Sequence, residues 1–252
     1  MPLSVTLITF NEEHNIAAAL ESVRWADEII VIDAESTDAT VSIASRFTEH
    51  VIVRKWPGYA AQKQFAAEQA RHEWILSIDA DERVSPELAL EIQEIINNPA
   101  TPQHGFYISR QNYYLGRAVH HSGWAPDYQL RLYRRQHGHW QGDYVHESVK
   151  LNGHIGRLQG RLDHYSIQSL SAHHRRLDRY TTLAAEELRT RAVRVSLLDL
   201  LLRPPLALLR SYLLRLGVLD GFAGITIAYF AAYYVFLKYA KAWERQSADP
   251  AQ

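Results

Sequence analysis

The segment Ile75-Leu76-Ser77-Ile78-Asp79-Ala80-Asp81-Glu82 is an apolar run that ends abruptly in carboxylates. A continuous apolar stretch of this length is typical of a buried parallel strand. Acidic groups at the C-terminal end of such a strand lie where open α/β sheets bind their ligands. Asp79 and Asp81 could share one divalent cation, and oxygen ligands suit Mg²⁺ or Mn²⁺. The alternative is a solvated acidic turn after the strand.

Composition restricts the kind of protein. The chain has 252 residues, 47% of them apolar, which suffices for one large α/β domain with an appendage or for two small domains. It has no cysteine, which excludes disulfides, thiolate metal sites and cysteine nucleophiles. Because the N-terminal residues lack the basic region and cleavage site of a signal peptide, we expect the catalytic part to be cytoplasmic.

The charges are distributed unevenly along the chain. Residues 1–97 carry 7 Lys/Arg against 17 Asp/Glu, whereas residues 98–252 carry 20 against 11. An acidic half suits a cation site, and a basic half suits phosphate or an anionic membrane surface. Alternatively, the opposite charges of the two halves simply attract each other. No nucleic-acid-binding module is recognisable, so we expect no nucleic acid partner.

Strands and helices are predicted to alternate through the first hundred residues. The expected strands cover residues 3–10, 28–33, 51–53 and 74–78, and the expected helices 16–23, 39–47, 59–71 and 86–97. Such alternation with short connections predicts an α/β protein with a parallel, doubly wound sheet.

The pattern changes after this α/β part. Residues 106–114 and 129–133 alternate like antiparallel strands, and the chain becomes helical from about residue 169. We therefore expect three regions: an α/β half over 1–98, a second segment of the same domain over 99–168, and a partly amphipathic helical extension over 169–252.

Three loops that follow predicted strands carry a family resemblance: Thr9-Phe10-Asn11-Glu12-Glu13, Asp33-Ala34-Glu35-Ser36-Thr37-Asp38 and Asp79-Ala80-Asp81. In this order and spacing they closely resemble the family 2 glycosyltransferases, which are inverting enzymes. The resemblance covers about residues 3–165. It implies a GT-A-type, doubly wound, mostly parallel sheet that binds a nucleotide sugar, with a small antiparallel segment.

Other segments resemble a narrower branch, the bacterial lipopolysaccharide core β-1,4-glucosyltransferases. These are Gly58-Tyr59-Ala60-Ala61-Gln62-Lys63, Val145-His146-Glu147 and residues 213–239. This resemblance implies transfer of a hexose, glucose from UDP-glucose, to a glycolipid acceptor, the lipopolysaccharide inner core. The alternatives are a transferase similar to polyprenyl-phosphate sugar synthases, or a non-catalytic nucleotide-binding scaffold with the same fold.

The resemblance assigns the metal-binding residues. It implies that Asp81 contacts Mg²⁺ or Mn²⁺ directly and that Asp79 holds the ribose or a metal-bound water. A bound divalent cation stabilises the charge that develops on the departing diphosphate. His164 matches an additional metal ligand that some GT-A enzymes supply from beyond the sheet.

The resemblance also implies how the donor is held. Asp33 matches the position that accepts a hydrogen bond from uracil N3–H. Thr9, Asn11 and Glu12 match positions at the nucleoside. Lys63 would pair with a phosphate, and its alternative is a solvated surface lysine.

An inverting transfer needs a general base that removes the proton from the attacking acceptor hydroxyl. Because this base must stand on the opposite face of the sugar from the diphosphate, it comes from another part of the chain than the metal ligands. Glu147 is the first candidate and Asp127 the second. Arg131 and Arg134 could bind phosphate or could pair with the acidic half.

The C-terminal region is predicted to meet the membrane. Residues 222–237 form a sixteen-residue stretch without charge, which is short of the roughly 20 residues needed to span a bilayer. Tyrosines within it and Lys238, Lys241 and Arg245 after it suit a helix in the membrane interface. We therefore expect peripheral association with the inner face of the inner membrane. The alternative is a helical pair packed on the catalytic domain or on a partner.

Overall fold

The computed structural model describes residues 2–142 and 147–248. The chain divides into two compact units. The first, here called the sheet unit, comprises Met1–Gln111 and Asp127–His164, and the second, the helical unit, comprises Asn112–Pro126 and Tyr165–Gln252. Residues 112–126 thus belong with the C-terminal helices, whereas the sequence grouped them with the segment 99–168.

The main sheet has nine strands in the order β3-β2-β1-β4-β8-β6-β11-β5, with β7 paired to β6. The strands are β1 (Leu3–Thr9), β2 (Glu28–Asp33), β3 (Val51–Val53), β4 (Trp74–Asp79), β5 (Glu82–Val84), β6 (Gly105–Tyr114), β7 (Arg117–Ala118), β8 (Tyr128–Arg134) and β11 (Ile155–Ile167). The four strands β3, β2, β1 and β4 are parallel, and β8 continues the sheet antiparallel to β4.

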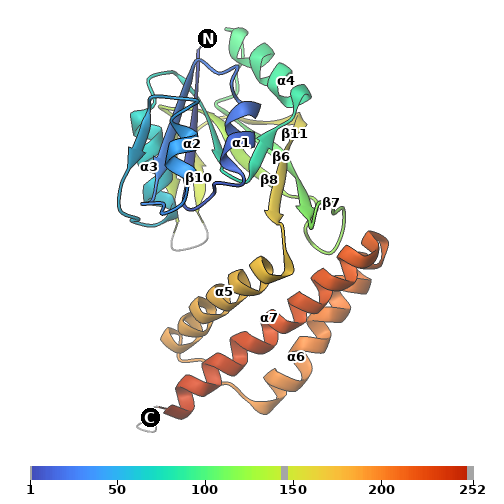
Figure 1. Cartoon of the computed structure of the whole chain (residues 1–252). Coiled ribbons are helices and arrows are strands. Elements are labelled where there is room, and N and C mark those ends of the chain that lie inside the picture. Colours follow the sequence, from blue (N-terminus) through green and yellow to red (C-terminus); the bar gives the residue numbers. More distant parts are fainter. Residues whose placement is uncertain (1, 143–146, 249–252) are drawn as a thin grey trace. The chain divides into compact units, whose positions relative to one another are not determined.

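The sheet unit has four helices and a separate hairpin (Figure 1). The helices are α1 (Ile16–Ser22), α2 (Thr40–Ala44), α3 (Tyr59–Gln69) and α4 (Pro86–Asn97), and the hairpin strands are β9 (Gly138–Gln141) and β10 (Ser148–Leu151). Ser85 caps the N-terminus of α4, and its side chain accepts a hydrogen bond from the backbone N–H of Leu88. The Glu87 carboxylate lies in its first turn, where the helix dipole favours negative charge.

The parallel strands are buried on both faces because alternate side chains enter two different cores. Leu3, Val5 and Leu7 of β1 pack with α1 and α4 in one core. Ile30 and Ile32 of β2 pack with α3 and the β9–β10 hairpin in the other. Helices therefore cover both faces of the sheet, and the predicted α/β class with a doubly wound sheet is confirmed.

The helical unit contains α5 (Leu170–Thr190), α6 (Leu197–Leu209), a π-helical turn at Arg210–Leu214, a 3₁₀ turn at Gly217–Asp220 and α7 (Gly221–Ala248). α7 packs against both α5 and α6 (Figure 1). The N-terminus of α6 is closed by a capping box, in which Ser196 and Asp199 exchange hydrogen bonds with each other's backbone N–H.

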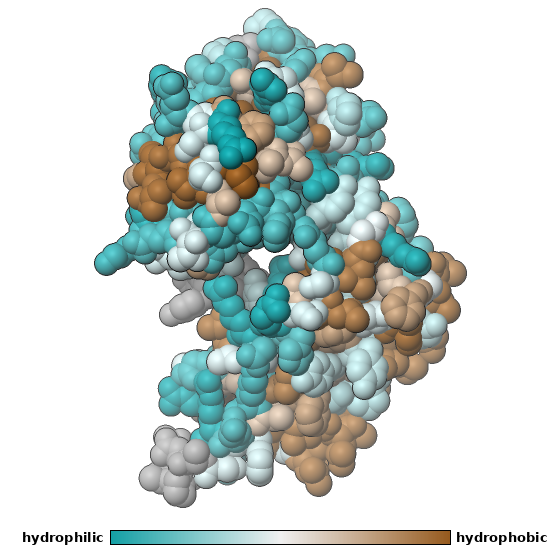
Figure 2. All heavy atoms as spheres, in the orientation of Figure 1, coloured by the Kyte–Doolittle hydropathy of each residue, from teal (hydrophilic) through white to brown (hydrophobic). Residues whose placement is uncertain are grey.

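Much of the apolar surface of the helical unit is exposed. No residue of α6 is buried, and Leu197, Leu198, Leu201, Leu202 and Leu206 are each more than half exposed. Figure 2 shows hydrophobic side chains gathered over α6 and α7. Among the described residues, one helical stretch, Gly217–Ser247, is long and apolar enough to cross a membrane by length and composition alone, and only 22% of its most apolar window is buried.

Candidate active site

The three motif loops meet at the carboxyl ends of the parallel strands. Thr9 of β1 pairs in register with Asp33 of β2, and Ile8 pairs with Asp79 of β4. The first two loops are also joined by hydrogen bonds, because Asn11 donates its backbone N–H to Ser36 Oγ over 2.8 Å. The geometry thus brings together the loops that the sequence singled out.

The residues predicted to hold the nucleoside lie at this edge. Thr9 is buried, and its hydroxyl has no hydrogen-bond partner among the described residues. Asp33 is fully buried, and its carboxylate accepts from the backbone N–H and the hydroxyl of Ser36. Glu12 accepts from the amide of Asn15 over 2.7 Å. The unpaired Thr9 hydroxyl leaves a polar group for a ligand to satisfy.

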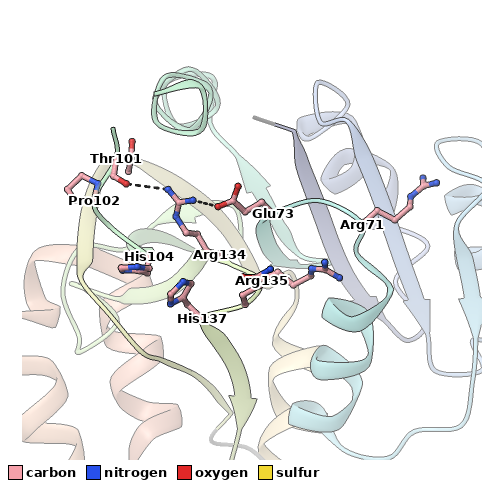
Figure 3. Close-up of a pocket in the computed structure, with 9 residues that line it drawn as sticks. Arg71, Glu73, Thr101, Pro102, His104, Arg134, Arg135 and His137 are labelled. Atoms are coloured by element: carbon pink, nitrogen blue, oxygen red, sulfur yellow. Dashed lines mark hydrogen bonds and ion pairs between the residues drawn. The ribbon is translucent and has the colours of Figure 1, made fainter. Parts of the chain in front are cut away.

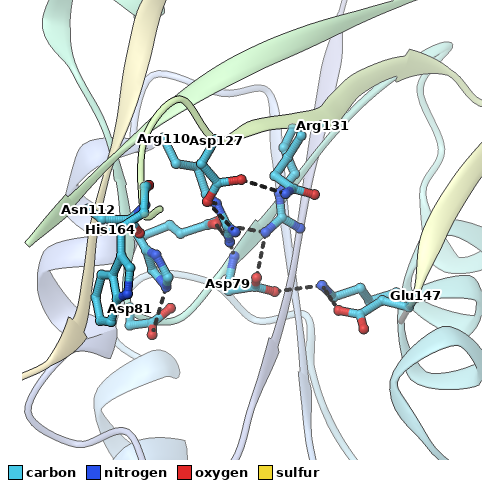
Figure 4. A network of polar contacts seen from close by, with 12 residues as sticks. Asp79, Asp81, Arg110, Asn112, Asp127, Arg131, Glu147 and His164 are labelled. Carbon is cyan, nitrogen blue, oxygen red and sulfur yellow. Dashed lines mark hydrogen bonds and ion pairs between the residues drawn. The ribbon is translucent and has the colours of Figure 1, made fainter. Parts of the chain in front are cut away.

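A continuous chain of alternating charges crosses the site (Figure 4). Each neighbour in this charge chain is an ion pair, with N–O distances between 2.5 and 3.2 Å. Its members, in order, are Glu147, Lys63, Asp79, Arg131, Glu82, Arg110 and Asp127. The two candidate bases, Glu147 and Asp127, therefore occupy opposite ends of one charge chain.

The centre of the charge chain is buried. The side chains of Glu82, Lys63 and Arg131 are 0%, 2% and 4% exposed. Burial alone would raise the pKa of the Asp79 carboxyl, but the charges of Arg131 and Lys63 outweigh burial and hold the pKa well below its usual range. Asp79 is thus kept as a carboxylate whose charge two cations already balance.

Lys63 is not the solvated surface residue considered as an alternative. Its ammonium lies 2.9 Å from Asp79 Oδ1 and 2.9 Å from Glu147 Oε1, and 4.9 Å from the centre of the Trp140 ring. An ammonium has three N–H donors, so one remains for a further acceptor. The sequence allowed Arg131 either to bind phosphate or to form ion pairs. In the structure Arg131 pairs with Asp79 and Glu82.

Asp81 has a different environment from Asp79. Strand β5 pairs antiparallel with β11, and the register of Glu82 with His164 brings the His164 ring to Asp81. His164 Nε2 lies 3.3 Å from Asp81 Oδ2 (Figure 4). The described residues contain no preassembled group of three or more His, Cys, Asp or Glu ligands.

This donor set nevertheless fits a divalent cation that shares its coordination with a substrate. Mg²⁺ in phosphate-transfer sites takes one or two carboxylates and completes its shell with phosphate oxygens and water. Asp81 and His164 supply a carboxylate and an imidazole at one point, whereas the oxygens of Asp79 already contact Lys63 and Arg131.

Two members of the charge chain were missed by sequence reasoning. Glu82 directly follows the Asp79-Ala80-Asp81 motif, and its position in the sequence indicates only an acidic turn. Arg110 lies in β6, where nothing in the alternating pattern separated it from its neighbours. Val145 and His146 of the Val145-His146-Glu147 motif lie outside the described residues.

Comparison with known proteins identifies the family of this chain. The profile described as Glycosyl transferase family 2 matches residues 4–149. The chain belongs to glycosyltransferase family 2. The "Lipopolysaccharide core biosynthesis glycosyltransferase LpsC" of Rhizobium meliloti is 30% identical to it, over 98% of this chain and 94% of the relative. The "Uncharacterized glycosyltransferase RT0209" of Rickettsia typhi is 32% identical, over 95% of this chain and 86% of the relative.

Solved structures of low identity are also similar. The S. aureus TarS 1–349 structure in complex with UDP-GlcNAc has a TM-score of 0.49 at 15% identity, covering 98% of this chain and 92% of that one. The structure of glucosyl-3-phosphoglycerate synthase of Mycobacterium tuberculosis with Mn²⁺ and UDP-glucose has a TM-score of 0.37 at 20% identity. The match covers 45% of this chain and 43% of that one.

Proposed function

We propose that this family 2 glycosyltransferase moves a hexose, with glucose from UDP-glucose as the expected donor, to the lipopolysaccharide inner core. The transfer would invert the anomeric centre in a single displacement. The similarity to the lipopolysaccharide core biosynthesis glycosyltransferase of Rhizobium meliloti supports a lipopolysaccharide acceptor. One observation carries the proposal: the two aspartates of the motif are separated, with Asp79 held by two cations and Asp81 beside His164.

Asp81 and His164 would hold the Mg²⁺ or Mn²⁺. When bound, the cation would act as a Lewis acid that stabilises the negative charge on the departing UDP. Lys63 would use its remaining N–H to bind a phosphate oxygen, and Arg131 would keep Asp79 ionised beneath the donor. The unpaired Thr9 hydroxyl and the Asp33 carboxylate would meet the nucleoside, as the family resemblance implies.

The charge chain favours Asp127 over Glu147 as the base, which reverses the order suggested by the sequence. Glu147 shares Lys63 with Asp79 and so lies with the cation expected to meet the diphosphate. The base must lie across the sugar from that group. Asp127 is at the other end of the charge chain, where Arg110 and Gln129 fix its carboxylate at 2.6 and 2.8 Å.

Two variants test this assignment. Asp127→Asn should lower kcat about 10²–10⁴-fold, the usual contribution of a general base, and leave UDP binding nearly unchanged. Glu147→Gln should retain most of its turnover. If Glu147→Gln abolishes turnover with UDP binding intact while Asp127→Asn remains active, Glu147 is the base.

The overall function is tested with the purified chain by measuring released UDP. UDP-glucose, UDP-galactose and UDP-GlcNAc are offered with and without Mn²⁺, using truncated lipopolysaccharide core as acceptor. A polyprenyl phosphate in a parallel reaction tests the alternative acceptor class. Turnover only with the polyprenyl phosphate would overturn the assignment of lipopolysaccharide as the acceptor. Turnover only with UDP-GlcNAc would overturn the assignment of UDP-glucose as the donor.

Membrane association is part of the proposal. The exposed leucines of α6 and the aromatic residues Phe222, Tyr229 and Trp243 of α7 offer an apolar surface, and each of these three aromatics is more than half exposed. Arg203, Arg210 and Arg215 lie near this surface in sequence, where they could meet anionic lipid headgroups. Such association would bring the site to a glycolipid acceptor on the inner face of the inner membrane.

A further inference from the structure

A cationic pocket opens at the far end of β4 from the candidate active site. β4 runs from Trp74 to Asp79, and the pocket lies beside the residues that precede Trp74, about 17 Å from Asp79 at the usual rise of a strand. Its volume is about 470 Å³, within the range of small-molecule sites. The charged and imidazole side chains of its lining are Arg71, Glu73, His104, Arg134, Arg135 and His137 (Figure 3).

Positive charge exceeds negative charge in this lining. Arg134 is paired with Glu73 and stacks over the Trp74 ring at 4.6 Å, so its position is fixed. Arg71 pairs with the buried Glu28 at 2.6 Å. The guanidinium of Arg135 donates to the carbonyl of Ala70 over 3.0 Å, and no carboxylate of the described residues forms an ion pair with it.

Two imidazoles are held side by side in the pocket, with ring centres 4.0 Å apart (Figure 3). His104 Nδ1 accepts the backbone N–H of His154 over 3.2 Å, so neutral His104 carries its proton on Nε2. His137 Nδ1 donates to the carbonyl of Asn152 over 3.0 Å. Neutral His104 therefore has Nε2–H available as a donor to a ligand, whereas His137, whose Nδ1 carries the proton, offers Nε2–H as a second donor only as an imidazolium.

The backbone is shaped to hold the first of these rings. Gly153 has φ +132°, and a Cβ at this position would lie 2.3 Å from His104 Nδ1. Glycine, which has no Cβ and tolerates this φ, allows the backbone to lie this close to the His104 ring. Partial burial and then the neighbouring charges of His137 and Arg134 lower the pKa of His104. The neighbouring cations thus disfavour a charged imidazole, and a bound anion would reverse that effect.

We propose that this pocket is a binding site for a phosphomonoester, separate from the donor site. A guanidinium fork and imidazole N–H groups are the donors that recognise a phosphate dianion. Arg135, His104 Nε2 and His137 Nε2 are the contacts, and the Arg134–Glu73 pair shapes the wall. The phosphate is carried either by the lipopolysaccharide acceptor or by a free sugar phosphate.

The direct test uses the full chain and inorganic phosphate, with UDP present at saturation to occupy the donor site. The His104 and His137 Cε1–H resonances are titrated with pH in phosphate and in chloride at equal ionic strength. Phosphate should move both titration midpoints to higher pH, by about one pH unit for His104. Identical midpoints in phosphate and chloride would overturn the proposal.

Matched variants locate the site. Arg135→Gln and His137→Gln should each weaken phosphate binding about tenfold, the loss expected for one charge-assisted contact. Arg24→Gln removes another exposed arginine elsewhere on the sheet unit and should leave binding unchanged. An equal loss with Arg24→Gln would indicate a general charge effect and would count against the pocket.

Binding measurements then separate the two sources, and they do not require transferase activity. If the phosphate is on the acceptor, intact core oligosaccharide binds more tightly than phosphatase-treated oligosaccharide, and Arg135→Gln removes the difference. If it is a free metabolite, glucose 6-phosphate binds and is sensitive to Arg135→Gln. If Arg135→Gln leaves the binding of both ligands unchanged, the proposed site is refuted, whatever the outcome of the donor screen.

Discussion

Arg131 contacts Asp79 at 2.5 Å and so ties β8 to the carboxyl end of β4. The same guanidinium group lies 2.7 Å from the fully buried Glu82. This geometry makes Arg131 the centre of the charge chain, and the Asp79 carboxylate depends on it for both its position and its ionisation.

Removing Arg131 should strongly destabilise the sheet unit. Arg131→Met leaves Glu82 buried without its main partner, and breaking a buried ion pair in this way typically costs about 3–5 kcal/mol. Urea unfolding of the full chain measures the loss. The exposed Arg24→Met provides the control and should change the free energy of unfolding by less than about 0.5 kcal/mol. A similar small change for both variants would contradict a structural role for the charge chain.

The two aspartates of the motif should differ in metal dependence. Asp81→Asn and His164→Gln should raise the Mn²⁺ concentration for half-maximal activity by about 10–100-fold, because they remove the two proposed ligands. Mn²⁺ binding measured by electron paramagnetic resonance should weaken in parallel. Asp79→Asn should instead act on folding, since it leaves Lys63 and Arg131 with one partner fewer. Stronger loss of Mn²⁺ binding with Asp79→Asn than with Asp81→Asn would reverse the proposed roles.

The helical unit should lose stability in mild acid. His173 stacks on Phe230 and contacts the Tyr114 hydroxyl at 3.0 Å, and burial, followed by the charge of Arg176, lowers its pKa to about 4. The unfolded chain protonates His173 near 6.5, so stability is fully present above that pH and is lost as pH falls towards 4. After allowance for partial exposure, we expect a loss of about 2 kcal/mol.

Hydrogen exchange of α5 at several pH values measures this effect. His173→Phe should lower protection at neutral pH, because the Tyr114 hydroxyl loses its partner, but should remove most of the dependence on pH between 6.5 and 4. His174→Gln changes the adjacent exposed histidine and should keep the dependence of the unmodified chain. A steep dependence that persists in His173→Phe would assign the effect to another group.

Membrane binding should depend on the leucines of α6. Replacing Leu201, Leu202 and Leu206 by serine removes three side chains that are 54–61% exposed, and should reduce binding to anionic vesicles more than tenfold. Leu90→Ser is the matched control, because Leu90 is 63% exposed but lies on α4 of the sheet unit. Vesicle flotation gives the readout. Unchanged flotation of the triple variant would exclude α6 as the membrane-binding surface.

The parallel part of the fold was predictable because it depends on local signals. β1, β2, β3 and β4 are short runs rich in apolar and β-branched residues, and the register of neighbouring parallel strands then brings Thr9, Asp33 and Asp79 to one edge. The antiparallel strands β5, β9, β10 and β11 were not predicted. β5 has three residues, too few for a periodic signal, and β11 interrupts its apolar alternation with polar side chains.

The same distinction applies to the site. Spacing alone does not distinguish Asp79 from Asp81, which only the family resemblance separated, and pairing between β5 and β11, about eighty residues apart, is what brings His164 to Asp81. Likewise, Glu147 contacts Lys63 across 84 positions. Such partners are set by sheet order, which spacing along the chain does not encode.

The charge chain also has a consequence for enzymology. The charges of these seven side chains, in unbroken contact, influence one another's ionisation, so an apparent pKa in a rate profile belongs to the coupled carboxylates together. A bell-shaped curve for this enzyme would therefore describe the collective protonation of the site, and neither limb could be assigned to Asp127 or Glu147 from its midpoint. Kinetic isotope and rescue experiments, which follow individual atoms, are better suited to identifying the residue that accepts the proton.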